Sequence, residues 1–398
     1  MDALKGIRVI SFNHFLMGPL GIQYLGDLGA DVIAVEPIEG AFQRKWGGLD
    51  SLTIDGHTML HLLGNRNKRS VALNLKDPRG VAIVRKLIAT ADVVAENFRP
   101  GVMEKLGLGY DAVKAIKPDI IYAAGSGFGA DGPYVNRPGQ DLIIQAMSGL
   151  AAITGKRGEG PRAVGVSIVD HHGAALYAMG ILAALLRRER ESGGCRVDVN
   201  LLSAALSLQQ ESLTCYLNGG RPPDVSQPGH VAGWYYSPPY GIYPTADGHI
   251  AISLGSLDLI YDILGVPAAE RIAADRAFAE QERVSNLLAG YLAGNVTAHW
   301  VSAFQKNDVW HSPVNDYAAV AADPQVRHLE SFLTVTGESG TPVTLVNHPV
   351  FYDGAAPGVR LPPQRLGAQT MAVLRELQFS AVEIDELRAA GVALVASD

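Results

Sequence analysis

The sequence predicts an α/β fold whose larger part is a Rossmann-like domain built on a parallel sheet. In the first third of the chain, apolar runs of 5–7 residues alternate with segments of helical pattern. Nearly continuous apolar runs are typical of parallel strands that helices cover on both faces. Hydrophobic residues make up 47 % of the 398 residues and charged residues 18 %, which indicates a well-filled core and excludes a disordered chain.

The predicted strands and helices follow one another in the order that a βαβ sheet requires. We expect strands at residues 8–12, 30–36, 70–75, 91–98 and 120–124. Gly18-Pro19 begins a helix that runs to about residue 28, and Asp77 and Pro78 are typical of the N-cap and first position of another. Longer helices are predicted at residues 140–152, 171–190 and 200–216.

A change of composition marks a domain boundary near residue 220. Gly, Pro and polar residues dominate residues 218–233. Beyond them, residues 234–310 have the pattern of a smaller α/β or α+β unit, with a strand pair around Ala246-Asp247-Gly248. The tail is predicted to contain a short helix at 316–321, strands at 332–335 and 341–346, and a final helical pair.

Several classes of protein are disfavoured by composition. A net charge of −7 argues against nucleic acid as a partner. Two cysteines, Cys195 and Cys215, cannot form a disulfide framework or a four-Cys zinc site. The longest apolar run, residues 173–186, has 14 residues, whereas a bilayer span needs roughly 20. No signal-peptide pattern is visible, so we expect a cytoplasmic protein without a membrane partner.

Two motifs resemble those of known cofactor and metal sites. Residues 127–132 match GxGxxG after a strand, but Pro133 follows instead of a helix, which disfavours a nicotinamide site. The triplet Asp170-His171-His172 would need further ligands at strand ends to hold a metal. Alternatively, Asp170 is the N-cap of a long helix, which would keep its carboxylate ionised. We therefore expect no metal.

A local excess of positive charge points to a phosphorylated small molecule. Residues 61–110 contain nine Lys and Arg against four acidic residues. Four of these basic residues lie beside predicted strand ends, where α/β sheets bind ligands, and they are Arg69, Lys76, Arg99 and Lys105.

A set of motifs covers nearly the whole chain in order. They include LKGIRV at 4–9, GDLGADVIAVE at 26–36, NKRS at 67–70, LKDPRG at 75–80, ADVVAENFRPG at 91–101, TADG at 245–248 and ADPQV at 322–326. In these motifs the sequence resembles the family III CoA-transferases, the group that includes formyl-CoA:oxalate CoA-transferase, carnitine CoA-transferase and α-methylacyl-CoA racemase.

The resemblance implies a particular architecture. It predicts a large domain over residues 1–220, a small inserted domain over residues 221–325, and a C-terminal segment, residues 326–398, that packs back on the large domain. It also implies an interlocked homodimer, in which two subunits thread through each other.

The resemblance also implies a CoA-transferase with Asp170 as the nucleophile. Asp170 would form an acyl-aspartyl anhydride and then an aspartyl-CoA thioester, with Gln140 and Asp141 as neighbouring catalytic positions. The positions implied to hold CoA are His14, Phe15, Leu73, Lys76, Asn97, Phe98, Arg99, Lys105 and Leu106. Acyl-CoA and a small organic acid are then substrates, and no tightly bound cofactor is expected.

Departures from the family pattern bear on the substrate. Gln140 occupies the position of the histidine that racemases use, and Gln cannot abstract an α-proton. Pro37 replaces a usual arginine, which leaves Arg44 as the nearest basic substitute, and Gly229–Gly233 is the only candidate for a glycine-rich loop. These changes favour an acid larger and less polar than oxalate, such as a dicarboxylate like succinate. The alternatives are an acyl-CoA racemase or epimerase and a non-catalytic acyl-CoA-binding homologue.

Overall fold

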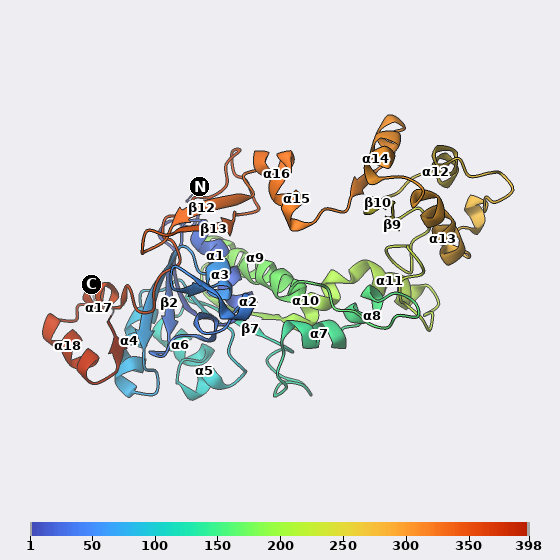
Figure 1. Cartoon of the computed structure of the whole chain (residues 1–398). Helices are drawn as coiled ribbons and strands as arrows, with labels where there is room; N and C mark the ends of the chain where they lie inside the picture. The colour runs from blue at the N-terminus through green and yellow to red at the C-terminus, as the bar shows by residue number, and fades with distance from the viewer. Residues whose placement is uncertain (1, 396–398) are drawn as a thin grey trace. The chain divides into compact units, whose positions relative to one another are not determined.

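The fold is described from a computed structural model, in which residues 2–395 are placed. The chain divides into two compact units (Figure 1). The large unit contains the residues up to Ile144, Ser167–Leu208 and the residues from Gln325 on. The small unit contains Gln145–Val166 and Gln209–Pro324.

A seven-stranded sheet forms the centre of the large unit, with the strand order β14-β5-β2-β1-β6-β7-β8. The five predicted strands are present as β1 (Arg8–Phe12), β2 (Asp31–Glu36), β5 (Lys68–Leu73), β6 (Val93–Glu96) and β7 (Ile121–Ser126). These strands and β8 (Cys195–Asn200) pair in parallel, and β14 (Ala393–Leu394) is antiparallel to β5. The predicted α/β class with a mostly parallel sheet is therefore confirmed.

Helices cover both faces of this sheet, because the side chains of each strand alternate between two apolar cores. Ile10 packs in a core with α4 (Pro78–Ile88), α6 (Tyr110–Ile116), α17 (Thr370–Glu376) and α18 (Ala381–Ala389). The neighbouring Val9 packs in the other core, with α1 (Met17–Asp27) and α9 (Ile168–Glu191). Figure 1 shows α1 and α9 side by side along the sheet.

The long helix α9 confirms the prediction of a buried core helix at residues 173–186. By length and composition α9 could cross a bilayer. However, it packs against α1 and β7, and side chains such as Tyr177 and Ile181 are fully buried between them. The buried part of its apolar surface is explained by its place in the core of the large unit, whereas Met179 and Leu186 are exposed.

Two predicted long helices are interrupted. The segment predicted at 140–152 forms α7 (Asp141–Met147) and α8 (Leu150–Thr154), because Gly149 between them has a φ of +88°. The segment predicted at 200–216 forms α10 (Leu201–Leu208) and α11 (Gln210–Asn218). Residues 127–140 contain no helix, as expected from Pro133.

The small unit has its own sheet and core. Its antiparallel sheet has the order β11-β10-β9, with β9 (Gly241–Pro244), β10 (His249–Ile252) and β11 (His311–Pro313). One face packs on α12 (Leu257–Leu264), α13 (Gln281–Leu292) and α14 (Thr297–Lys306).

The remaining elements are short. In the first part of the large unit they are η1 (Phe42–Arg44), α2 (Gly48–Ser51), β3 (Thr53–Ile54), β4 (His57–Thr58), α3 (Met59–Gly64) and α5 (Val102–Lys105). Later elements are η2 (Ala274–Arg276), α15 (Tyr317–Ala322), α16 (Pro324–His328), β12 (Phe332–Thr336) and β13 (Pro342–Val346). The helices and strands predicted in the tail are thus present within a few residues of their expected positions.

Candidate active site

A cavity of about 460 Å³ lies in the large unit where β1, β6 and β7 end. Its walls come from residues 14–17, 97–100, 125–129 and 135–142 and from the beginning of α9. The carboxyl ends of parallel strands are the usual ligand-binding edge of an α/β sheet. Eight predicted site residues line this cavity, namely Asp170, Gln140, Asp141, His14, Phe15, Asn97, Phe98 and Arg99.

Asp170 lies in the first turn of α9, and a different carboxylate binds the free amides of that turn. Asp141 Oδ1 accepts hydrogen bonds from the backbone N–H groups of Val169, at 2.8 Å, and Asp170, at 3.1 Å. The N-cap position belongs to Ser167. The prediction that Asp170 is the N-cap is therefore wrong, because Asp141 from α7 satisfies the amides that an N-cap would bind. The Asp170 carboxylate remains available to face the cavity.

The environment of Asp170 makes its ionisation depend on pH near neutrality. Burial, and to a smaller extent the nearby Asp141 carboxylate, raises the pKa of Asp170 to about 7, although a hydrogen bond from the Met17 backbone acts in the opposite direction. Met17 can approach because Gly173 on α9 has no side chain, and a Cβ there would lie 2.9 Å from Met17 Sδ. The beginnings of α1 and α9 thus meet at the carboxylate.

The loop after β1 is joined to the loop after β6 by a reciprocal pair of hydrogen bonds. Asn97 Oδ1 accepts from the His14 backbone N–H at 2.8 Å, and Asn97 Nδ2 donates to the His14 carbonyl at 2.9 Å. The His14 ring contacts the rings of Phe15 and Phe98, with centroid separations of 5.1 and 5.2 Å. Burial lowers the pKa of His14 to about 4, so this wall of the cavity is uncharged at neutral pH.

The opposite wall is a loop closed by two glycines. A Cβ on Gly127 would lie 2.5 Å from the Cα of Gly139, and the reverse distance is 2.4 Å. This close approach of two backbones closes the segment 127–139, which carries Phe128 and Arg137 to the cavity. The guanidinium of Arg137 stacks over the Tyr134 ring at 4.1 Å.

Four residues predicted to hold CoA do not line the cavity. Leu73 is fully buried in the core between the sheet and α4. Leu106 packs against the same core, whereas Lys76 and Lys105 are exposed. The assignment of these four residues to CoA therefore remains a prediction. Lys76 and Lys105 could contact only a part of the ligand that extends over the protein surface.

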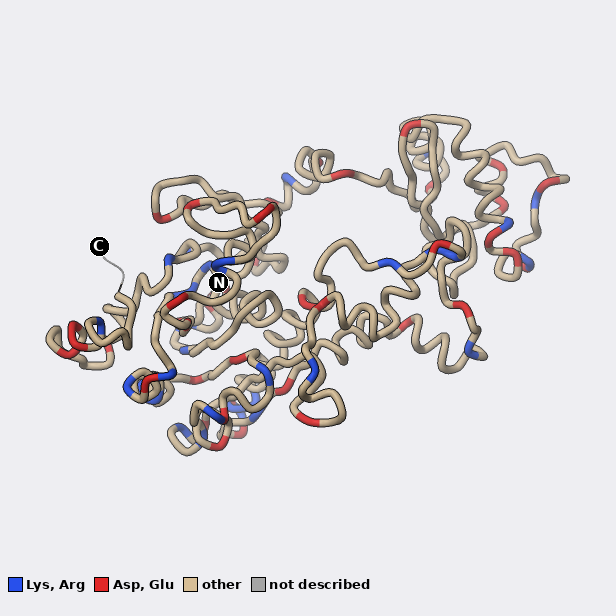
Figure 2. The backbone as a smooth tube through the Cα atoms, turned by 60° about the horizontal axis from the view of Figure 1, so that its bottom comes forward, with Lys and Arg blue, Asp and Glu red and all other residues tan. Residues whose placement is uncertain are grey.

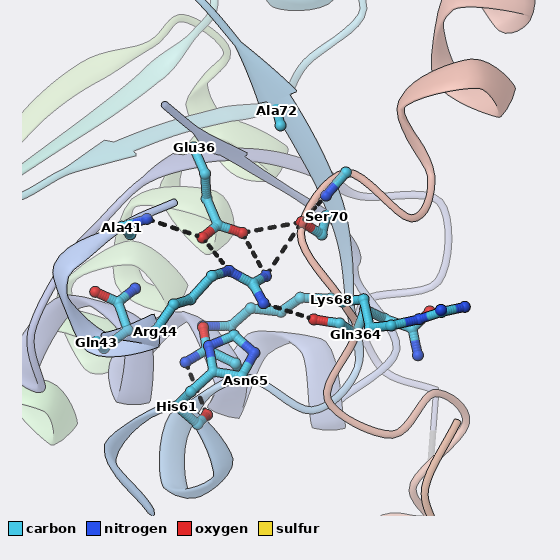
Figure 3. Close-up of polar contacts among 12 residues, drawn as sticks. Glu36, Ala41, Gln43, Arg44, His61, Asn65, Lys68, Ser70, Ala72 and Gln364 are labelled. Atoms are coloured by element: carbon cyan, nitrogen blue, oxygen red, sulfur yellow. Dashed lines mark hydrogen bonds and ion pairs between the residues drawn. The ribbon is translucent and has the colours of Figure 1, made fainter. Parts of the chain in front are cut away.

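Two basic residues do not have the positions that the sequence suggested. Arg69 lies near the beginning of β5, away from the ligand-binding strand ends, and forms ion pairs with Asp31 and Glu376. Figure 2 shows such basic segments next to acidic ones in the large unit. Arg44 binds Glu36 through Nε, at 2.6 Å, and Nη2, at 2.7 Å, and does not line the cavity (Figure 3). The expectation for Arg69 is wrong, because Arg69 lies near the beginning of β5 and not at its carboxyl end. Arg44 lies outside the catalytic cavity, so its use as a substitute for the usual arginine stays a prediction.

Sequence reasoning missed three features of the site. Arg137 and Trp46 line the cavity, and neither was among the predicted site residues. Glu96, at the end of β6, has a pKa raised to about 7 by burial, and it accepts a hydrogen bond from the Phe98 backbone N–H at 2.8 Å. Its position immediately before Asn97 was the one available signal.

Comparison with known proteins gives consistent matches over nearly the whole chain. The model of the family described as CoA-transferase family III matches residues 4–370. The chain is 35 % identical to the succinyl-CoA:glutarate CoA-transferase of Mus musculus, over 98 % of this chain and 90 % of that protein. It is 34 % identical to the succinate–glutarate CoA-transferase of Agrobacterium fabrum, over 94 % of this chain and 96 % of that protein. Among solved structures, a CaiB/BaiF family protein from Brucella suis superposes with a TM-score of 0.82 at 29 % identity, over 94 % of this chain and 99 % of that one.

Proposed function

Because the chain belongs to CoA-transferase family III, we propose that it moves CoA from an acyl-CoA donor to a carboxylic acid through covalent intermediates on Asp170. The observation that carries this proposal is the Asp170 carboxylate at the cavity, left free of the helix amides by Asp141. Transfer of CoA between two carboxylic acids without hydrolysis of the thioester requires that the enzyme hold the activated acyl group covalently. A carboxylate nucleophile can store it first as an anhydride and then as a thioester.

The chemical steps balance without added water or a net proton. An Asp170 oxygen attacks the donor thioester carbon and the C–S bond breaks. CoA thiolate leaves, and an acyl-aspartyl anhydride remains on Asp170. The thiolate then attacks the Asp170 carbonyl, which releases the donor acid and forms an aspartyl-CoA thioester. The acceptor carboxylate attacks the Asp170 carbonyl carbon of this thioester, the C–S bond breaks, and CoA thiolate leaves a second mixed anhydride between the acceptor and Asp170. The thiolate then attacks the acceptor carbonyl carbon of this anhydride, which forms the new acyl-CoA and releases the Asp170 carboxylate.

The positions of the cavity residues support these roles. In each step negative charge develops on a carbonyl oxygen, which backbone N–H groups can stabilise. The Met17 amide already donates toward Asp170 in the free protein. The walls near His14, Phe15 and Phe98 are apolar or neutral, and such a setting limits access of water to the anhydride. Asp141 is the first residue of α7, and Gln140 directly precedes it. Both line the cavity together with Asp170.

We further propose that the acceptor is a dicarboxylate whose distal carboxylate binds Arg137. Arg99 and Arg137 are the two cationic side chains in the cavity lining of the described chain, and Arg99 is predicted to contact CoA. A guanidinium binds a carboxylate through two parallel hydrogen bonds. Both relatives reported above are named for transfer between dicarboxylic acids, succinate and glutarate.

Kinetics with matched acceptors test the role of Arg137. We expect Arg137→Gln to raise KM for a C5 dicarboxylate by about 10–100-fold, as for loss of a charge-assisted hydrogen bond. The KM for a C5 monocarboxylate should change less than threefold, and Arg137→Lys should restore part of the difference. An equal effect on both acids would contradict recognition of the distal carboxylate.

We also propose the interlocked homodimer, which exposed apolar side chains support. On α9, Met179 and Leu186 are 60 % and 52 % exposed. On the sheet of the small unit, Ile242 and Trp310 are 49 % and 64 % exposed and border a cavity of about 770 Å³. Contiguous exposed apolar surface is typical of a face that a partner covers.

Trapping with hydroxylamine tests the covalent mechanism directly. The protein is incubated with a panel of acyl-CoA donors and hydroxylamine, and its peptides are analysed by mass spectrometry. We expect a hydroxamate on Asp170, and none in Asp170→Asn. Turnover with an unmodified Asp170 would overturn the mechanism.

Isotope exchange separates this function from racemisation. In deuterium oxide, with acyl-CoA but no acceptor acid, we expect no deuterium at the α-carbon, because Gln140 cannot act as a base. Exchange at that carbon would support a racemase or epimerase. Binding of acyl-CoA with neither transfer nor exchange across the donor panel would support a non-catalytic homologue.

A further inference from the structure

A second cavity in the large unit, of about 160 Å³, has a polar lining that is entirely basic. Its lining consists of Arg44, Gly56, His57, His61, Arg365 and Leu366. None of these residues lines the catalytic cavity. The two cavities therefore have separate linings.

Two stacked imidazoles form the buried part of this cavity. His57 and His61 are 3 % and 2 % exposed, and their ring centroids lie 4.8 Å apart with an interplanar angle of 23°. Neither ring nitrogen of His61, nor Nε2 of His57, has a hydrogen-bond partner in the part of the chain that the structure describes. The Gln364 backbone lies near the His61 ring but does not meet hydrogen-bond geometry. Buried polar groups are rarely left unpaired, so these nitrogens indicate a missing partner.

The two arginines extend the cavity from the imidazoles to solvent. Arg44 is fixed by Glu36 and by the Gln364 carbonyl, at 2.9 Å, and Figure 3 shows its guanidinium between the Glu36 carboxylate and the His61 ring. Arg365 donates Nε to Glu338 at 2.7 Å, and its side chain is 65 % exposed. A ligand that enters this cavity would thus pass the exposed Arg365 side chain before it reaches the buried imidazoles.

The charges around the cavity favour an anion over a cation. The neighbouring carboxylates do not line it: Glu36 binds Arg44 and Ser70, Glu338 binds Arg365, and Asp55 binds Ser339 through Oδ1, although Asp55 Oδ2 has no partner among the described residues. A cation in this cavity would meet two guanidinium groups in the lining, whereas no carboxylate lines it. In addition, the described residues contain no group of three His, Cys, Asp or Glu side chains that could hold a metal ion.

The imidazoles are suited to donate hydrogen bonds without adding charge. Burial lowers the pKa of both His57 and His61, and Arg44 lowers each of them further, although Glu338, Asp55 and Glu36 act in the opposite direction on His57. Each neutral ring retains one N–H donor. Arg44 Nε and Nη2 are occupied by Glu36 and Ser70, so the donors left for a small oxyanion are Arg44 Nη1, the Nη groups of Arg365 and the two imidazole N–H groups.

We propose that the His57–His61 cavity binds a free small oxyanion, of the class of inorganic phosphate, separately from CoA. A single water molecule needs only roughly 10–15 Å³ of such space, so the cavity is large enough for an ion of this size. Because its lining is distinct from that of the catalytic cavity, occupancy by phosphate is compatible with bound CoA.

Calorimetric titration with inorganic phosphate at pH 7 tests this site. The protein is first saturated with CoA, so that phosphate binding in the catalytic cavity is blocked. We expect one phosphate to bind, and Arg365→Gln to weaken this binding at least tenfold. Arg283→Gln is the matched control, because Arg283 forms a comparable surface ion pair with Glu280 in the small unit and carries the same charge. The affinity of the Arg283→Gln variant for phosphate should equal that of the unsubstituted protein.

Four results would overturn the proposal. The first is no phosphate binding to the CoA-saturated protein. The second is equal binding by Arg365→Gln, which removes an exposed side chain and should not impair folding. The third is displacement of phosphate by CoA, which would assign the anion to a phosphate of the substrate. A crystal structure grown with phosphate should show the ion within hydrogen-bond distance of His61, and water alone there would also contradict the proposal.

Discussion

The ionisation of Asp170 is governed by opposing influences on one carboxyl group. Burial and the Asp141 carboxylate raise its pKa, and the Met17 amide lowers it. The same Asp141 oxygen binds the Val169 and Asp170 amides. Asp141 therefore positions the nucleophile and also weakens its acidity, two effects that can be separated by substitution.

The first prediction concerns the pH dependence of transfer. Asp170 must be ionised to attack, and its pKa is about 7, so kcat/KM should rise with pH and level off above about 7. Below that value it should fall by about tenfold per pH unit. Asp141→Asn keeps an oxygen for the two amides but removes the charge, so its acid limb should move to lower pH. A flat profile from pH 5 to 9 would contradict an ionised Asp170 as nucleophile.

The second prediction concerns stability. The folded-state pKa of Asp170, about 7, is higher than the ordinary value of 3.8, so its ionised form destabilises the fold. This cost is absent below pH 4, grows between pH 4 and 7, and is constant above 7. Asp170→Asn should therefore raise the free energy of unfolding by about 2–4 kcal/mol at pH 8, and by almost nothing at pH 4. Denaturant unfolding at both values measures the difference. A gain of equal size at pH 4 would show that charge is not its cause.

At the scale of elements, the site depends on loops that two contacts hold in place. Asn97 joins the loop after β6 to the loop after β1. Gly127 and Gly139 close the loop that carries Arg137. The Asn97 contact joins segments 83 residues apart, so this part of the cavity forms only when the sheet has brought the ends of β1 and β6 together, whereas the glycine contact closes a single loop.

The third prediction follows from the glycine pair. Gly127→Ala or Gly139→Ala places a Cβ within 2.5 Å of the opposite Cα, so the loop must open and shift Arg137. We expect a rise of about tenfold or more in KM for the acceptor, because displacement of a positioning group by about 1 Å can cost that much or more. Gly255→Ala is the control, because a Cβ there meets nothing within 4 Å. Unchanged kinetics in both loop variants would show that the close approach is not required.

The prediction of elements from sequence was accurate where apolar periodicity was strong and failed where it was not. The five buried parallel strands were found, but β8 was missed because Arg196 and Asp198 interrupt its apolar pattern at one edge of the sheet. The break between α7 and α8 was also missed, since the conformation of Gly149 is not evident from composition. Edge strands and helix ends depend on tertiary contacts more than on local pattern.

At the scale of the whole molecule, the proposed interlocked dimer makes the fourth prediction. Two chains that thread through each other cannot separate without opening one of the rings. Light scattering should therefore show a dimer that persists on dilution to nanomolar concentration. Two differently tagged preparations, when mixed, should form no tagged heterodimer in hours but should form it after joint unfolding and refolding. A monomer, or heterodimer formation within minutes, would contradict the interlocked arrangement.

The α/β class, the positions of the five buried strands along the chain and, through motifs spread over the chain, the family could be predicted from the sequence alone. These features depend on residues close together in the chain, because the period of apolar side chains sets the type of each element. The family resemblance also brought attention to eight residues that line one cavity, Asp170 among them.

Only the tertiary structure decided how these residues are used. Asp141 and not Asp170 binds the α9 amides, Asn97 pairs with the His14 backbone 83 residues away, and Arg44 is bound by Glu36 and the Gln364 carbonyl. The pairing of a polar group depends on which donors and acceptors the fold brings within about 3 Å. That distance is set by packing between distant segments, and local sequence pattern carries no record of it.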